Sequence, residues 1–140
     1  MSRRALRAVL ASEVRTWDVM NLDIQDLRVV PELNSRSHWR VRAARFDAQR
    51  ARVRTAWRMK FFDFRPPLPV TVTLTRIATR PIHDSDNLIS GFKAIRDEVA
   101  ELLGTDDRDL GGKDGGITWR YEQLRGPARY VGVRVRVEWL

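Results

Sequence analysis

The stretch "VTVTLTRIATRPIHDSDNLISGFKAIRDEVAELLGTDD", residues 70–107, carries the clearest structural signal of the chain, a strand pattern followed by a helix pattern. In its first part, apolar residues alternate with threonines, which is typical of a strand with one buried face. The two sets are Val70, Val72 and Leu74 against Thr71, Thr73 and Thr75. A strand that leads into an amphipathic helix predicts a fold in which helices pack on a sheet.

The helical part, taken to begin at Asp86, has one apolar and one polar face. At about 100° per residue, six apolar residues form one continuous face. They are Leu88, Phe92, Ile95, Val99, Leu102 and Leu103. The opposite face carries Asp86, Ser90, Lys93 and Asp97. Asp84 precedes the helix, and in an extended segment it points the same way as Asp86.

A second, longer helix is expected earlier in the chain. Residues 40–59 contain neither Pro nor Gly and are dominated by Ala and Arg, which favours a helix. Phe46, Val53 and Trp57 recur at helical spacing and form a narrow apolar stripe. A first strand is expected within residues 17–30, before the loop that begins at Pro31.

Two more strands are expected at the C-terminal end. Residues 117–124 and 130–140 both alternate, and we expect them to pair with each other through the turn "RGPAR". The predicted fold class is therefore α+β, with a small mixed β-sheet of about four strands and two main helices. A length of 140 residues suits one domain, which we place at residues 17–140 after an N-terminal extension, residues 1–16.

The chain is strongly basic, with 26 Lys and Arg against 18 Asp and Glu and a net charge of +8. Nearly all the basic residues are arginines, because Lys60, Lys93 and Lys113 are the only lysines. The planar guanidinium suits bidentate contacts with phosphate, which favours a nucleic acid as the partner. An arginine-biased, GC-rich genome is the alternative explanation for the same excess.

Other features limit the cellular setting. The chain has no cysteine, which excludes disulfides and thiolate metal sites and fits a reducing compartment. No apolar run approaches the ~20 residues that a membrane span needs, so no membrane partner is expected. The basic N-terminal segment is too interrupted by arginine for a secretory signal, and we expect a cytoplasmic protein.

Acidic residues gather at both ends of the expected amphipathic helix. Asp84 and Asp86 precede or begin it, and Asp106 and Asp107 follow it. Carboxylates of this kind suit Mg²⁺, and a nearby lysine such as Lys93 stabilises negative charge on a phosphodiester. The alternative is structural: Asp86 as an N-cap with Asp84 favouring the helix N-terminus, a solvated lysine, and an ordinary turn after the helix.

The order of strand, D-x-D-N, amphipathic helix with a polar-face lysine, and G-x-D-D resembles the RusA family of Holliday junction resolvases, often carried by phages. The upstream segment that begins "PELNSRSHW" is similar to the loop that precedes a helix in that family. The resemblance covers the chain from about Asp18 to the C-terminus. It implies an α+β homodimer that makes paired, Mg²⁺-dependent nicks across four-way DNA junctions, with Mn²⁺ as a substitute metal.

The resemblance also implies roles for individual residues. Asp84, Asp86 and Asp107 are the expected catalytic metal ligands, with Asp106 as a fourth. The family lysine falls at Ser90, and we assign its role to Lys93, which shares a face with that serine. The expected DNA contacts are Asn34, Arg36, His38, Trp39, Arg40, Arg42, Arg45 and Asn87.

Several points stay open at the level of sequence. Trp39 either stacks on an exposed base or is buried, and the further arginines Arg50, Arg52 and Arg54 are read as a phosphate-binding face. The Gly-rich segment around Lys113 lacks the pattern of a phosphate loop, so no nucleotide cofactor is expected. The alternatives to a resolvase are a non-catalytic DNA-binding module and a Mg²⁺-dependent nuclease that acts on flaps or forks.

Overall fold

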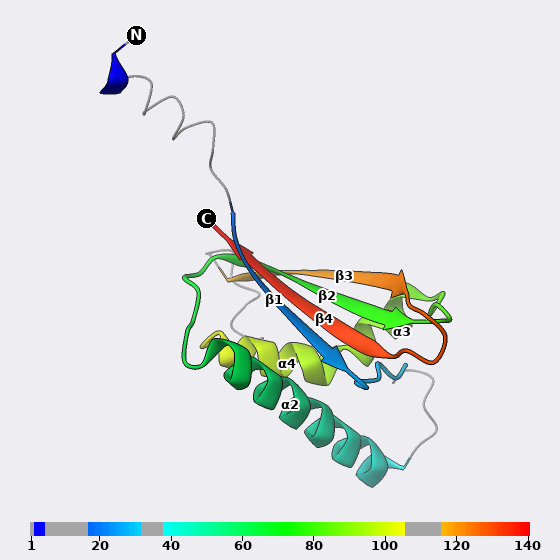
Figure 1. Ribbon diagram of the computed structural model, residues 1–140. Helices are drawn as coiled ribbons and strands as arrows, with labels where there is room; N and C mark the ends of the chain where they lie inside the picture. The colour runs from blue at the N-terminus through cyan, green and yellow to red at the C-terminus, as the bar shows by residue number, and fades with distance from the viewer. Residues whose placement is uncertain (1, 5–16, 32–37, 106–115) are drawn as a thin grey trace.

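The computed structural model describes residues 2–4, 17–31, 38–105 and 116–140. Figure 1 shows a four-stranded sheet with the two longer helices, α2 and α4, lying along one of its faces. The elements are β1 (Asp18–Gln25), α2 (Trp39–Phe61), β2 (Val70–Ala78), α3 (Ser85–Gly91), α4 (Lys93–Leu102), β3 (Ile117–Arg125) and β4 (Gly132–Trp139). The predicted α+β class with a small mixed sheet is confirmed. In the described part of the chain, no helix is long and apolar enough to cross a membrane.

The strand order is β1-β4-β2-β3, which corrects one predicted pairing. β4 is antiparallel to both β1 and β2, whereas β3 is parallel to β2. The expected hairpin between β3 and β4 is therefore wrong, because β2 lies between them. Residues 126–131 instead carry the chain past the end of β2, where the Gly126 amide donates to the Ala78 carbonyl (3.1 Å).

The central place of β2 follows from its side chains. Val72 and Leu74 are fully buried, but Thr73 and Thr75 on the opposite face are also buried, at 7% and 3% exposure. Side chains that are buried on both faces of a strand suit the middle of a sheet, where strands on both edges help to shield them. The parallel pairing with β3 requires a crossover connection, and the helices α3 and α4 supply it.

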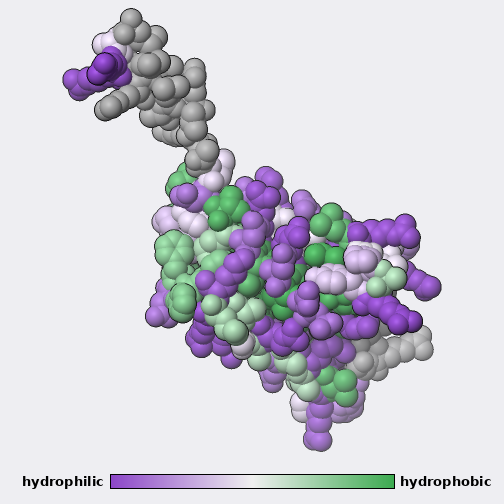
Figure 2. Space-filling view, in the orientation of Figure 1, coloured by the Kyte–Doolittle hydropathy of each residue, from purple (hydrophilic) through white to green (hydrophobic). Residues whose placement is uncertain are grey.

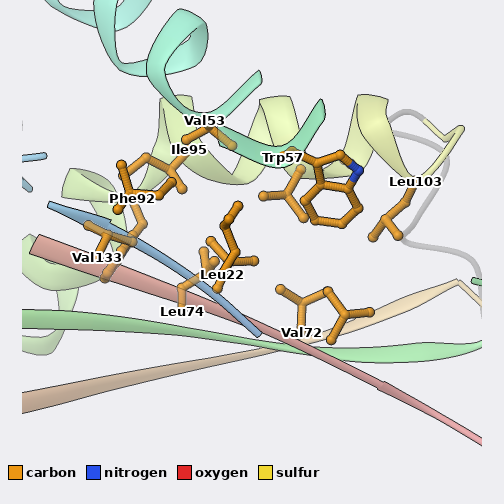
Figure 3. Close-up of a cluster of buried hydrophobic side chains, with 14 of the residues drawn as sticks. Leu22, Val53, Trp57, Val72, Leu74, Phe92, Ile95, Leu103 and Val133 are labelled. Atoms are coloured by element: carbon orange, nitrogen blue, oxygen red, sulfur yellow. The ribbon is translucent and has the colours of Figure 1, made fainter. Parts of the chain in front are cut away.

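The core lies between the sheet and the helices (Figure 3). Val53 and Trp57 of α2 and Ile95 of α4 point toward the sheet and pack with strand residues such as Val72 and Leu74. The wheel prediction holds for the other helical positions too, since all six apolar residues assigned to that face are buried or half-buried.

Two details of the predicted helices differ from the structure. Phe46 is half-exposed, and Gln49 is buried in the α2 stripe, where its amide donates to the Arg28 carbonyl (2.7 Å). The predicted amphipathic helix after Asp86 is divided at Phe92 into α3 and α4, and the Phe92 backbone N–H is shared between the carbonyls of Ile89 and Ser90.

Gly91, just before the break, has a packing role. A Cβ at this position would lie 2.5 Å from Val29 Cγ1 and 2.9 Å from the Val30 carbonyl oxygen. Only glycine leaves room for the segment after β1 to cross the helix so closely. The crossing fixes the residues that lead toward α2 beside the end of α3.

Candidate functional site

Asp84 is the N-cap of α3. Its Oδ1 accepts a hydrogen bond from the Asp86 backbone N–H (2.8 Å), and its carbonyl accepts the first helical hydrogen bond, from the Leu88 N–H (3.1 Å). A cap of this kind satisfies an N–H that the helix itself leaves unpaired. The alternative in which an aspartate caps the helix is therefore confirmed, but the N-cap is Asp84 and not Asp86. The hydrogen bond uses one of the two carboxylate oxygens of Asp84.

Asp86 follows in the first turn of α3, and both carboxylates are exposed to solvent. The two aspartates are two positions apart in the sequence, and they lie at the end of the connection that follows β2. Lys93 begins α4, with its side chain 61% exposed and its Nζ 3.6 Å from Asp97 Oδ2. Ser90 donates to the Asn87 carbonyl (3.1 Å) instead of facing solvent fully.

Gln123 of β3 holds the segment that leads to these carboxylates. Its Nε2 donates to the Ile82 carbonyl and its Oε1 accepts from the Ile82 N–H, both at 2.8 Å. Arg76 of β2 joins them by donating from Nη1 to Gln123 Oε1 (3.1 Å) and to the Arg80 carbonyl (2.7 Å). Partial burial lowers the pKa of Arg76 from its ordinary value. The backbone two residues before Asp84 is therefore fixed to the sheet at two points.

We expect Gln123→Ala to lower the free energy of unfolding by about 1–3 kcal/mol, because it leaves half-buried polar groups of Ile82 without partners. Chemical denaturation of the variant and the wild type measures the difference. Gln25→Ala is the matched control, since Gln25 is an exposed strand glutamine, and its effect should stay within about 0.5 kcal/mol. Equal effects of the two substitutions would contradict the anchoring role of Gln123.

The later arginines of α2 have partners within the protein, so their assignment to a phosphate-binding face stays a prediction that these contacts do not favour. Arg54 Nη2 lies 2.5 Å from Glu98 Oε1, and Arg50 contacts both Glu98 (3.6 Å) and Glu101 (2.5 Å). Arg52 donates to the Gln25 carbonyl. The side chain of Glu98 is only 1% exposed, so the two arginines neutralise a buried carboxylate.

The first turn of α2 presents a different surface. His38 is the N-cap, and its Nδ1 accepts from the Arg40 N–H (3.2 Å). Trp39 is 61% exposed, which decides against the buried alternative. The Arg40 guanidinium lies over its ring, 5.3 Å from the centroid. Arg42 is exposed as well, and hydrophilic side chains cover much of the molecular face in Figure 2.

Other predicted DNA contacts are placed less favourably or are not described. Arg45 is half-exposed and has an interaction partner. Asn87 is buried at 9% exposure, so its assignment to DNA contact stays a prediction that burial does not favour. Asn34 and Arg36 lie outside the described residues.

The second acidic pair, Asp106 and Asp107, also lies outside the described residues, and Thr105 is the last described position before it. Figure 1 shows α4 ending at the opposite end of the sheet from α3. From Ser85 to Leu102 the two helices would span about 27 Å if they ran on in one line. The C-terminal end of α4 is thus separated from the start of α3 by the length of the two helices.

The donors at this site suit a hard cation with few protein ligands. Among the described residues, no group of three or more His, Cys, Asp or Glu side chains is arranged to hold a metal ion. Mg²⁺ is usually bound by one or two carboxylates together with waters and substrate phosphates, so the pair Asp84 and Asp86 fits this pattern. The described residues do not supply the larger set of protein ligands that would surround a metal ion completely.

The chain was compared with protein-family models and with curated proteins, and neither comparison found a match.

Proposed function

We propose that the chain is a Mg²⁺-dependent, structure-specific endodeoxyribonuclease of RusA type that resolves four-way DNA junctions in the cytoplasm. The observation that carries the proposal is the pair of exposed carboxylates, Asp84 and Asp86, at the start of α3 in a protein of net charge +8. Cleavage of a phosphodiester needs a cation to neutralise charge. Two exposed carboxylates on one anchored turn give a basic protein a place to bind that cation.

Each residue of the site has a distinct task. Asp84 and Asp86 supply carboxylate oxygens to the cation, and the Gln123 anchor fixes the turn that carries Asp84. When bound, Mg²⁺ supplies charge neutralisation at the phosphate and activates water for attack. Lys93 places an ammonium group on the exposed side of α4, where it stabilises the negative charge that develops on the phosphate. Asp97 holds that ammonium near the helix.

The first turn of α2 is the proposed DNA contact. Arg40 and Arg42 are exposed and suit phosphate contacts, which position DNA without reading its sequence. Trp39 offers an exposed ring, already flanked by the Arg40 guanidinium, on which an unpaired base at a junction can stack. Asn34 and Arg36 belong to the same proposed surface by sequence.

The proposed homodimer explains how the two acidic pairs serve one site. The end of α4, the last helix before the second acidic pair in the sequence, lies at the opposite end of the sheet from α3. We therefore propose that a site that uses Asp84, Asp86 and Asp107, with Asp106 as a further ligand, draws them from two protomers. A two-fold protein then presents two such sites to a two-fold junction, which suits paired symmetric nicks.

Mixing two inactive variants tests this arrangement. We expect Asp86→Asn and Asp107→Asn proteins to be inactive separately and to regain about one quarter of the wild-type nicking sites after subunit exchange, because half of the dimers then carry one intact site of two. The restored product should be a single nick rather than a pair. No recovery in a mixture shown to contain heterodimers would contradict a shared site.

The first test of activity compares a labelled four-way junction with a matched duplex and a fork, in Mg²⁺ and in EDTA. Paired nicks confined to the junction and abolished by EDTA support the proposal. Cleavage mainly of the fork would favour the flap or fork nuclease. The cap hydrogen bond of Asp84 favours a second candidate, a non-catalytic DNA-binding module, which would bind the junction and cleave nothing with Mg²⁺ or Mn²⁺.

A further inference from the structure

The two edges of the sheet differ in how they are protected. Along β1, Lys60 Nζ donates to the Asn21 carbonyl and Arg52 Nη2 to the Gln25 carbonyl, both at 2.5 Å. These α2 side chains occupy carbonyls that a further strand would need, which is one way to block an edge strand. In the described part of the chain, no lysine or arginine caps a backbone carbonyl of β3 in this manner.

The side chains of β3 also suit continued burial. Trp119 and Tyr121 are only partly buried although both pack against the core, and Arg96 of α4 reaches both, with its guanidinium 4.9 Å from the Trp119 ring centroid and its Nη1 2.9 Å from Tyr121 Oη. The apolar layer therefore extends to this edge and stops there. An edge strand nine residues long with half-covered aromatic residues invites another strand.

The sequence of β3 is self-complementary about its centre. In an antiparallel pair of two copies centred on Tyr121, Arg120 of each copy lies opposite the partner's Glu122. Both side chains are exposed on the face away from the helices. Opposite charges that face each other across two strands stabilise the pair, and the two-fold symmetry makes the contact twice.

We infer that β3 is the dimerisation edge, where a second copy of the chain pairs antiparallel and extends the sheet to eight strands. This inference rests on the homodimer of the proposed function and names its interface. Because Gln123 ties Ile82 to the end of β3, the pairing brings Asp84 and Asp86 of one copy to the start of the partner's β3. Figure 1 shows that, within one chain, β3 starts at the end of the sheet where α4 finishes. The interface therefore brings the start of α3 in one copy to the end of the sheet where α4 finishes in the other.

Charge reversal at the central pairs tests the interface without DNA. Arg120→Glu and Glu122→Arg each place like charges opposite each other twice, and we expect the dimer dissociation constant to rise about 10-fold or more in each, as measured by sedimentation equilibrium. An equimolar mixture of the two variants should regain wild-type affinity as a heterodimer. Both residues are exposed, so circular dichroism should show unchanged folding.

A cross-link provides a second measurement, since the chain has no cysteine of its own. An oxidised mixture of Arg120→Cys and Glu122→Cys proteins should form a disulfide-linked dimer, and neither protein alone should do so. Unchanged association of the reversed variants, failure of their mixture to associate, or a monomeric wild type would overturn the β3 interface. Cleavage of the junction is measured separately. A dimer that forms through β3 but cuts no DNA would reject the proposed nuclease and keep the β3 interface. A nuclease whose activity and association are unchanged by both charge reversals would reject the β3 interface and keep the nuclease.

Discussion

Asp86→Asn is expected to reduce junction nicking in Mg²⁺ by more than about 100-fold, since even groups that only support metal ligands contribute about 10- to 100-fold. Asp86 lies exposed in the first turn of α3, and the cap hydrogen bond of α3 uses its backbone N–H and not its carboxylate. The amide that replaces the carboxylate keeps the shape of the side chain but removes its charge. Folding and the cap should therefore persist while affinity for the cation falls.

Binding to the junction should be kept or tightened in the same variant, because one negative charge near the phosphate is gone. Electrophoretic mobility shift in EDTA measures binding, and single-turnover cleavage measures nicking. Asp47→Asn is the matched control, an exposed aspartate of α2 outside the candidate site, and it should cleave like the wild type. Equal cleavage by both variants would remove Asp86 from the site.

Local sequence patterns are sufficient to predict the strands and helices, but they are not sufficient to predict which strands pair with each other. The alternation in residues 70–77 and the helical spacing after Asp86 predict strand and helix correctly, because each depends on residues close in sequence. The strand pairing of β3 does not depend on its own pattern. It follows from the crossover through α3 and α4, which requires a parallel neighbour for β2 and leaves the far side of β2 to β4.

The candidate site is predictable in part for the same reason. Asp84 and Asp86 are neighbours in sequence, so their proximity can be read directly, although which of them caps the helix cannot. Gln123 escapes a sequence-based prediction because it contacts Ile82 across 41 positions. The available signal is its place in the alternation of β3, two residues after Tyr121 on the face toward the core.

The arginines of α2 look like one surface in the sequence because their partners lie on another helix. Glu98 is 44 positions from Arg54, and Glu101 is 51 from Arg50. A carboxylate at the edge of an apolar face, together with two arginines four residues apart, is the available signal of a buried ion pair. The structure divides the helix into an exposed first turn and a second half that holds α4.

This division predicts opposite effects for two double variants. Arg50→Ala with Arg54→Ala leaves the Glu98 carboxylate buried without partners, and we expect the free energy of unfolding to fall by about 3–5 kcal/mol. Further replacement of Glu98 by leucine should recover most of this decrease, because the uncompensated charge is then absent. Chemical denaturation of the double and triple variants provides the comparison.

The matched double variant replaces the two exposed arginines at the start of the same helix. Arg40→Ala with Arg42→Ala should change the free energy of unfolding by no more than about 0.5 kcal/mol for each substitution. It should instead weaken junction binding and reduce the salt dependence of the binding constant by about one unit of slope for each phosphate that is no longer bound. A decrease in stability of this variant, or normal stability in the Arg50 and Arg54 variant, would contradict the division, because the two pairs of arginines share a helix and differ only in what they contact.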